Sequence, residues 1–206
     1  MLTATLGLAL LLALGPTPQF FEVNAVELDV RLEPSDGRLA AKASLHLRSR
    51  RVRPAETLAL VLPAPFQNRA RIRAVWDETG VLAWHTEMAE AALLIRVTFA
   101  RPLPALARRT VVVSFELDCG GLDSSAPAQL TARTARLEST GWYPLPAGSV
   151  SDRLRRVRLA VRLSRSWRVE RRLRMKRVRS GKHVAEYELT AENVARDTLL
   201  FRAHAQ

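Results

Sequence analysis

Hydrophobic and polar residues alternate with a period of two along most of the chain. Between residues 26 and 32, Val and Leu alternate with Glu, Asp and Arg, and a similar alternation covers residues 39 to 47. The segment Pro34-Ser35-Asp36-Gly37 between them has the composition of a tight turn. The pattern predicts a β-hairpin with one buried face and one face in water.

The same alternation recurs in short segments that are mostly separated by proline or glycine. These segments are residues 58–62, 70–76, 93–99 and 111–117. Residues 119–134 are rich in Gly, Ser, Ala and Pro, which predicts a long surface loop. After the N-terminal residues, no segment long enough to form a stable helix has helical periodicity. We therefore expect an all-β fold, an antiparallel two-layer sandwich or saddle-like sheet of roughly ten strands.

The first residues form a separate segment. Residues 1–19 contain the apolar run Leu6 to Leu14 followed by small and turn-forming residues, as in a secretory signal peptide. A membrane-spanning helix needs about 20 apolar residues, so the run is too short to span a bilayer. We expect a secreted or periplasmic protein if this leader is cleaved, and otherwise attachment to the membrane through this segment. Residues 20–206 are then a single β domain.

Positive charge is concentrated in the segment LRRVRLAVRLSRSWRVERRLRMKRVR, residues 154–179. The whole chain has a formal net charge of +12, and the segment with Arg153 holds thirteen Lys and Arg against one acid, Glu170. On a helix its hydrophobic residues would scatter around the circumference, whereas on strands they share one side. The pattern predicts two adjacent strands whose outward arginines form a candidate ligand or partner surface: Arg156, Arg158, Arg162, Arg168, Arg172 and Arg174.

The second of these strands should pair with the strand that follows it. A loop at residues 179–181, with Gly181 in the left-handed conformation, would set the register. The expected cross-strand pairs are Leu173 with Tyr187, Met175 with Ala185, Arg174 with Glu186, and Arg172 with Glu188.

The sequence lacks the common catalytic, zinc-binding and nucleotide-binding motifs. It contains no HExxH, GxSxG, GxxxxGK[ST] or GxGxxG, and no two of its four histidines have the i, i+4 spacing of a helical zinc site. Cys119 is the only cysteine, and no helix start or cluster of cations is near it to activate the thiol, so we expect a structural residue. We expect no catalytic residue, no metal, no cofactor and no enzymatic activity of the chain alone.

The order of the strand segments resembles a known family. The hairpin LDVRLEPSDGRLAAKASLHLR is followed by PAETLALVL, by LIRVTFARPLPALARRTVVVSFEL, by GWYP with Trp142, Tyr143 and Pro144, and by a segment ending near ENVARDTLLF. This order resembles the N-terminal β domain of gluzincin zinc aminopeptidases, the membrane alanyl aminopeptidase type, over residues 22–206. Many relatives have Pro-Cys-Phe-Asp where this chain has Pro144-Leu145-Pro146-Ala147.

The resemblance implies a saddle-shaped domain that packs on a separate catalytic domain, and the latter carries the zinc ligands and the general base. It also implies two weak candidates for a substrate-amine anchor, Gln129 and Glu138. The aromatic pair Trp142 and Tyr143 could form a recognition surface or plug an edge of the sandwich.

Three functional hypotheses follow. The first is an exported, non-catalytic binding or scaffolding module, or the truncated half of a metallopeptidase, whose partner is a separate catalytic domain or another protein. The second is a binder of polyanions, such as lipopolysaccharide, anionic lipid or nucleic acid, through the outward arginines. Nucleic acid is disfavoured, because export separates the protein from it and Trp167 points with the core residues instead of outward. The third is a hydrolase with an unrecognised site.

Overall fold

The structure is a computed structural model that describes residues 21–123, 125–148, 153–170, 175–195 and 198–206. Within these residues the regular elements are strands β1 to β16 and one short 3-10 helix, η2. The all-β prediction is therefore confirmed. The predicted leader lies outside the described residues and stays a prediction. In the described part of the chain, no helix has the length and apolar character needed to cross a membrane.

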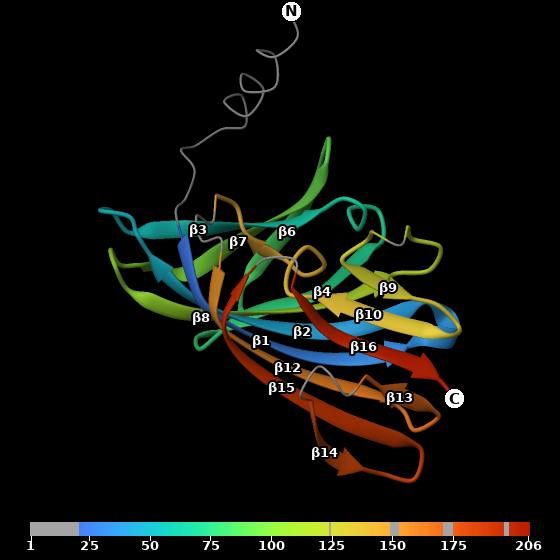
Figure 1. Cartoon of the computed structure of the whole chain (residues 1–206). Coiled ribbons are helices and arrows are strands. Elements are labelled where there is room, and N and C mark those ends of the chain that lie inside the picture. The colour runs from blue at the N-terminus through green and yellow to red at the C-terminus, as the bar shows by residue number, and fades with distance from the viewer. Residues whose placement is uncertain (1–20, 124, 149–152, 171–174, 196–197) are drawn as a thin grey trace, which may run out of the picture.

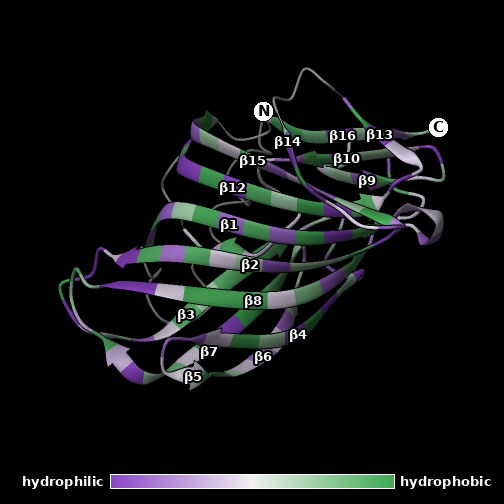
Figure 2. Cartoon of the chain, turned by 90° about the horizontal axis from the view of Figure 1, so that it is seen from below, coloured by the Kyte–Doolittle hydropathy of each residue, from purple (hydrophilic) through white to green (hydrophobic). Residues whose placement is uncertain are grey.

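Eight strands form one large sheet in the order β14-β15-β12-β1-β2-β8-β4-β5. Neighbouring strands are antiparallel except β1 and β12, which run parallel with Val26 beside Val157. Figure 2 shows the open face of this sheet, where hydrophobic and hydrophilic residues alternate along β12, β1, β2 and β8. The strands are β1 (Phe21–Glu33), β2 (Arg38–Ser49), β4 (Ala70–Asp77), β5 (Gly80–Val81), β8 (Arg108–Asp118), β12 (Arg153–Ser164), β14 (Lys176–Ser180) and β15 (Val184–Ala195).

The hairpin of β1 and β2 has the predicted position and turn. Residues Pro34–Asp36 form η2, and Gly37 follows in the left-handed conformation with φ of 64°. The Gly37 amide donates a hydrogen bond to the carbonyl oxygen of Pro34 at 3.1 Å. Burial alternates along both strands, as a sheet with one covered face requires.

Two four-stranded sheets lie on the same side of the large sheet (Figure 1). One has the order β11-β3-β7-β6 and the other the order β13-β16-β10-β9. The first consists of β3 (Ala55–Pro63), β6 (Ala83–Ala89), β7 (Ala92–Leu103) and β11 (Leu145–Pro146), and the second of β9 (Ala128–Leu130), β10 (Thr134–Glu138), β13 (Trp167–Val169) and β16 (Leu199–Ala205).

The hydrophobic core fills the space between the large sheet and the two small sheets. Leu45 and Val113 of the large sheet, Leu60 and Ile95 of one small sheet, and Phe201 of the other are all fully buried members of one cluster. The two-layer arrangement is therefore the predicted one. The expectation of roughly ten strands was too low, and the predicted loop at residues 119–134 contains β9, because strands of two or three residues are too short to show a period.

Candidate functional site

The arginine-rich segment is divided between two sheets. Residues 153–164 form β12 inside the large sheet, residues 167–169 form β13 in a small sheet, and residues 176–180 form β14 at the edge of the large sheet. Arg168 therefore lies on a different sheet from Arg156, Arg158 and Arg162. Arg172 and Arg174 lie outside the described residues. The predicted pair of adjacent strands is thus wrong, although β12 itself buries Val157, Leu159, Val161 and Leu163 as expected.

The central part of the outward face is an ion-pair network. Arg158 Nε donates to Glu188 Oε1 of β15 at 2.6 Å, and Arg158 Nη1 lies 3.7 Å from Glu27 Oε2 of β1. Glu27 lies 3.5 Å from His46 of β2, whose Nδ1 is 3.0 Å from the hydroxyl of Thr110 on β8. A chain of polar contacts thus crosses five strands, from β15 to β8.

These contacts change the acidity of the groups that make them. The hydrogen bond from Arg158 is the main cause that lowers the pKa of Glu188, and the same bond raises the pKa of Arg158. Arg162, further along β12, also contacts two acids. Its Nη2 lies 2.9 Å from Asp29 Oδ2 and its Nε lies 4.0 Å from Glu186 Oε2. Arg158 and Arg162 are therefore each compensated by one acid of β1 and one acid of β15.

The last basic residues of the segment lie at the edge of the large sheet. All five residues of β14 are exposed, and four of the residues at 176–182 are basic: Lys176, Arg177, Arg179 and Lys182. Charged side chains on an edge strand protect it against pairing with another chain. The basic residues of β14 therefore have a structural role that needs no ligand.

The register of this hairpin differs from the prediction. Lys176 lies opposite Glu188 and Ser180 opposite Ala185, with a bulge between Arg177 and Arg179. The turn is closed by a hydrogen bond of 2.9 Å from the Gly181 amide to the Val184 carbonyl. The predicted register, in which Met175 faces Ala185, is wrong because the turn lies later in the chain and the bulge adds a residue to one strand.

The aromatic landmark of the sequence is part of the core. Trp142 and Tyr143 are fully buried, and their rings pack edge to face with centroids 5.1 Å apart. The Trp142 indole donates to the Glu138 carbonyl at 2.7 Å, and the Tyr143 hydroxyl donates to the Ser139 carbonyl. Pro144 is also buried. The pair thus plugs the molecule between its layers and offers no surface for recognition.

The two anchor candidates lie on the same small sheet. Gln129 of β9 is directly opposite Arg136 of β10, and Glu138 at the end of β10 forms an ion pair with Arg136. Glu138 is buried and Gln129 half-buried. The sheet therefore brings the two side chains to either side of one arginine. A role in holding a substrate amine stays a prediction.

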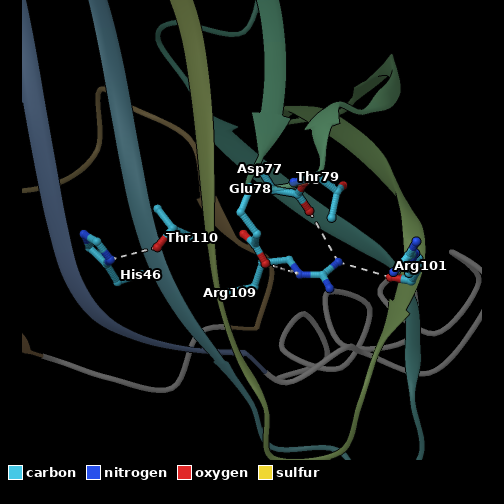
Figure 3. A network of polar contacts seen from close by, with 7 residues as sticks. All are labelled: His46, Asp77, Glu78, Thr79, Arg101, Arg109 and Thr110. Carbon is cyan, nitrogen blue, oxygen red and sulfur yellow. Dashed lines mark hydrogen bonds and ion pairs between the residues drawn. The ribbon is translucent and has the colours of Figure 1, made fainter.

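Arg109 lies at the centre of a polar network that the sequence did not predict (Figure 3). Arg109 Nη1 lies 3.3 Å from Asp77 Oδ2 and donates to the Arg101 carbonyl at 3.1 Å, and Arg109 Nε lies 3.2 Å from Glu78. The guanidinium carbon is 5.0 Å from the centroid of the Phe99 ring. A charged residue at a position of β8 that points inward was the available sequence signal.

A cavity of about 530 Å³ lies beside this network, at the end of the large sheet where β1 and β12 begin. It is lined by Asn24, His46, Leu47, Glu78, Arg108, Arg109, Thr110 and Arg155. Arg108 lies directly opposite Arg48 of β2, so two like charges face each other across the ladder. Like charges in that position are destabilising unless an anion lies near them.

Cys119 is buried, and burial with the nearby Asp118 raises the pKa of its thiol to about 12. The thiol is therefore neutral and unreactive at neutral pH, as a structural role requires. Among the described residues, no three of the side chains His, Cys, Asp and Glu gather in a group that could hold a metal ion.

No protein-family model matches the chain, and no curated protein matches it. Several solved structures match the chain in fold. The M1 zinc metallopeptidase from Deinococcus radiodurans matches with a TM-score of 0.68 and 16% identity, over 89% of this chain and 42% of that chain. A mutant of that enzyme bound to a Tyr-Ser-Ala substrate gives the same values. A two-domain M1 zinc metallopeptidase mutant bound to L-tryptophan matches with a TM-score of 0.64 and 16% identity, over 92% of this chain and 44% of that chain.

The likeness concerns the fold. This chain spans less than half the length of the solved structures that it matches, as expected for a likeness to their N-terminal domain alone. The resemblance indicated by the order of the strand segments is therefore confirmed at the level of the fold. The chain has the fold of the N-terminal β domain of M1 zinc metallopeptidases.

Proposed function

We propose that this domain is a non-catalytic module that binds a zinc-peptidase catalytic domain, supplied either by the same longer polypeptide or by a separate chain. The observation that carries the proposal is the fold likeness over 89% of this chain and 42% of the matched enzyme. The sequence has no HExxH motif of its own. Peptide hydrolysis therefore depends on the partner, and the chain alone has no peptidase activity.

The small sheet β13-β16-β10-β9 is the face proposed to meet the catalytic domain. It carries Gln129 and Glu138 on either side of Arg136, and these polar side chains are partly covered already. A carboxylate or amide there offers acceptors for the amino group of a peptide. The domain thus contributes a wall of the substrate site, and the partner contributes the zinc and the general base.

Polyanion binding by Arg158 and Arg162 of β12 has less support than the peptidase-related function. Arg158 and Arg162 are each compensated by two acids, so an incoming phosphate must compete with carboxylates that are already bound. For a hydrolase within the chain, the described residues offer no group of His, Cys, Asp and Glu side chains that could hold a catalytic metal ion.

The test begins with the coding sequence that surrounds this chain. The chain is co-expressed with a neighbouring polypeptide that contains HExxH, and association is measured by light scattering coupled to size exclusion. We expect a one-to-one complex that contains zinc and hydrolyses aminoacyl nitroanilides, whereas the isolated chain does neither. Glu138→Gln should weaken turnover in the complex, and Glu192→Gln, at an exposed position of β15, is the matched control. Hydrolysis by the isolated chain, or a catalytic partner that works equally well without it, contradicts the proposal.

A further inference from the structure

One end of the large sheet combines exposed hydrophobic side chains with a cluster of arginines. The loop between β2 and β3 carries Val52, and the loop between β7 and β8 carries Leu106; their exposed fractions are 94% and 60%. A hydrogen bond of 2.9 Å from the Ser49 amide to the Ala107 carbonyl joins the bases of the two loops. Figures 1 and 2 show both loops at the same end of the sheet, at the left of each view.

The loop between β7 and β8 holds its exposed hydrophobic residue in an unfavourable backbone conformation. Leu106 has a φ of 58°, a region that glycine or asparagine normally occupies. A hydrogen bond from the Ala107 amide to the Pro104 carbonyl at 3.2 Å closes a turn in which Leu106 is the third residue. A leucine that is both conformationally unfavourable and exposed is a signal of function at the loop tip.

Arginines are frequent in these two loops and at the neighbouring ends of β2, β7, β8 and β12, and acids are few there. We define the basic end as Val52 and Leu106 together with Arg48, Arg50, Arg51, Arg53, Arg101, Arg108 and Arg155. The nearest acid of β1, Glu22, is shared by Arg50 at 3.1 Å and Arg155 at 3.3 Å, so one carboxylate serves two cations. Glu56 is the exposed acid at the start of β3, and Glu78 in the neighbouring cavity is paired with Arg109.

The first described residue of the chain lies at this same end. Phe21, the first described residue, lies directly opposite Ser49, at the base of the loop that carries Val52. Six residues separate Phe21 from Leu14, the last residue of the apolar run, and they span at most about 25 Å when extended. While that run remains in the chain and is inserted in a bilayer, the basic end lies close to the bilayer surface.

We propose that the basic end docks on the surface of a bilayer that contains anionic phospholipids. Val52 and Leu106 insert between the headgroups, and the guanidinium groups of the basic end bind lipid phosphates. A guanidinium can donate two parallel N–H hydrogen bonds to the oxygens of one phosphate. Apolar insertion combined with basic side chains is the usual composition of a surface that binds anionic membranes. The opposite end of the domain, where β16 ends, stays away from the membrane (Figure 1).

The cavity beside Arg108 gives one of these phosphates a defined place. Its lining includes Asn24, Thr110 and Arg155 as donors, and the opposed pair Arg48 and Arg108 gains a counter-charge when a phosphate enters. The ligand therefore relieves a repulsion that the free protein contains. This proposal is independent of any catalytic partner.

The first experiment measures sedimentation of the full chain with vesicles of phosphatidylcholine, with and without phosphatidylglycerol. In the test variant, Arg50→Gln, Arg53→Gln and Arg108→Gln are combined. In the control variant, Arg177→Gln, Arg179→Gln and Lys182→Gln remove the same charge from the β14 edge. We expect the phosphatidylglycerol-dependent affinity to fall at least tenfold in the test variant and by less than about threefold in the control. Equal losses, or no dependence on phosphatidylglycerol, overturn the proposal.

The second experiment locates the contact. Cys119 is buried and its thiol is neutral, so Val52→Cys provides a single reactive site for an environment-sensitive fluorophore. On anionic vesicles we expect a blue shift and quenching by nitroxide lipids at position 52. The same label at Val178→Cys, an exposed residue of β14, should show neither. A label at position 52 that stays in water while the protein binds vesicles overturns the insertion of this loop.

Discussion

Nη1 of Arg109 lies 3.3 Å from Oδ2 of Asp77, whose side chain is completely buried, while that of Arg109 is 9% exposed. Asp77 Oδ1 also accepts hydrogen bonds from the amide and the hydroxyl of Thr79, which fixes the turn between β4 and β5. Asp77 Oδ2 has no hydrogen bond of its own, so the nearby guanidinium is its main compensation. The pair therefore joins β8 to that turn.

Removing Arg109 should leave the buried carboxylate of Asp77 without a counter-charge, held only by its hydrogen bonds from Thr79. We expect Arg109→Met to lower the free energy of unfolding by about 3–5 kcal/mol, as is typical when one partner of a buried ion pair is lost. The double variant Asp77→Asn with Arg109→Met should recover part of this loss, because no charge remains buried. Urea denaturation measures both, and a double variant less stable than Arg109→Met alone would contradict this explanation.

Gly37 and Gly121 offer a matched comparison, because both have φ of 64°. A Cβ at Gly37 would lie 2.8 Å from the Cα of Gly120, whereas a Cβ at Gly121 would have no atom within 4 Å. Gly121→Ala should lower the free energy of unfolding by about 1–2 kcal/mol, because alanine is unfavourable in the left-handed conformation. Gly37→Ala should lower it by at least about 1 kcal/mol more, because the backbone at Gly120 must also move to make room for the Cβ. Equal losses of unfolding free energy would show that the contact with Gly120 relaxes freely.

Trp142 should contribute stability through both its volume and its indole N–H. Trp142→Phe loses the hydrogen bond to the Glu138 carbonyl and leaves that buried oxygen without this donor, at a cost of about 1–3 kcal/mol. Trp142→Ala should cost about 3–5 kcal/mol. Trp84→Phe is the control, because Trp84 is only partly buried. A loss for Trp84→Phe as large as that for Trp142→Phe would argue against the buried hydrogen bond as the cause.

The pair of Arg158 and Glu188 should make stability depend on acid and salt. The hydrogen bond from Arg158 lowers the pKa of Glu188 in the folded state, so its stabilisation is complete above the unfolded pKa of about 4.3 and is lost as pH falls through the folded value. Glu188→Gln should therefore lower the Tm slightly at pH 7 and have a smaller effect near pH 3.

High salt should shrink the effect of Glu188→Gln as well, because both side chains are in contact with solvent. Glu192→Gln, on the same strand, is the control and should change little at any pH. Differential scanning calorimetry in matched buffers gives the comparison. A Tm difference for Glu188→Gln that stays constant from pH 7 to pH 3 would contradict the assignment.

The long strands were predictable from the sequence because each buries one face. Leu28 and Val30 of β1, or Val111 and Val113 of β8, are buried at every second position. The strand β14 could not be placed in this way, because all its residues, including Val178, are exposed and no buried hydrophobic residue defines its register. The parallel pairing of β1 with β12 was equally hidden, since both strands have the same alternation as their antiparallel neighbours.

The candidate sites were predictable only in part. The sequence gives the outward direction of Arg158 and Arg162, but their acids lie on β1 and β15, and a local pattern does not reveal which strands are neighbours. The basic end depends on the same kind of information, because Arg48 and Arg108 are brought together by the pairing of β2 with β8. Exposure of Leu106 depends on a turn conformation that its residue type does not favour.

The parallel pairing of β1 and β12 also determines the order in which the domain can assemble during synthesis. Arg162 contacts Asp29 from 133 positions further along the chain, so β1 has emerged from the ribosome long before its partner exists. Until then, β1 can pair with β2 but keeps its other edge open to any extended segment, including one from another nascent chain. Folding yield should therefore be limited by the time that passes before β12 arrives.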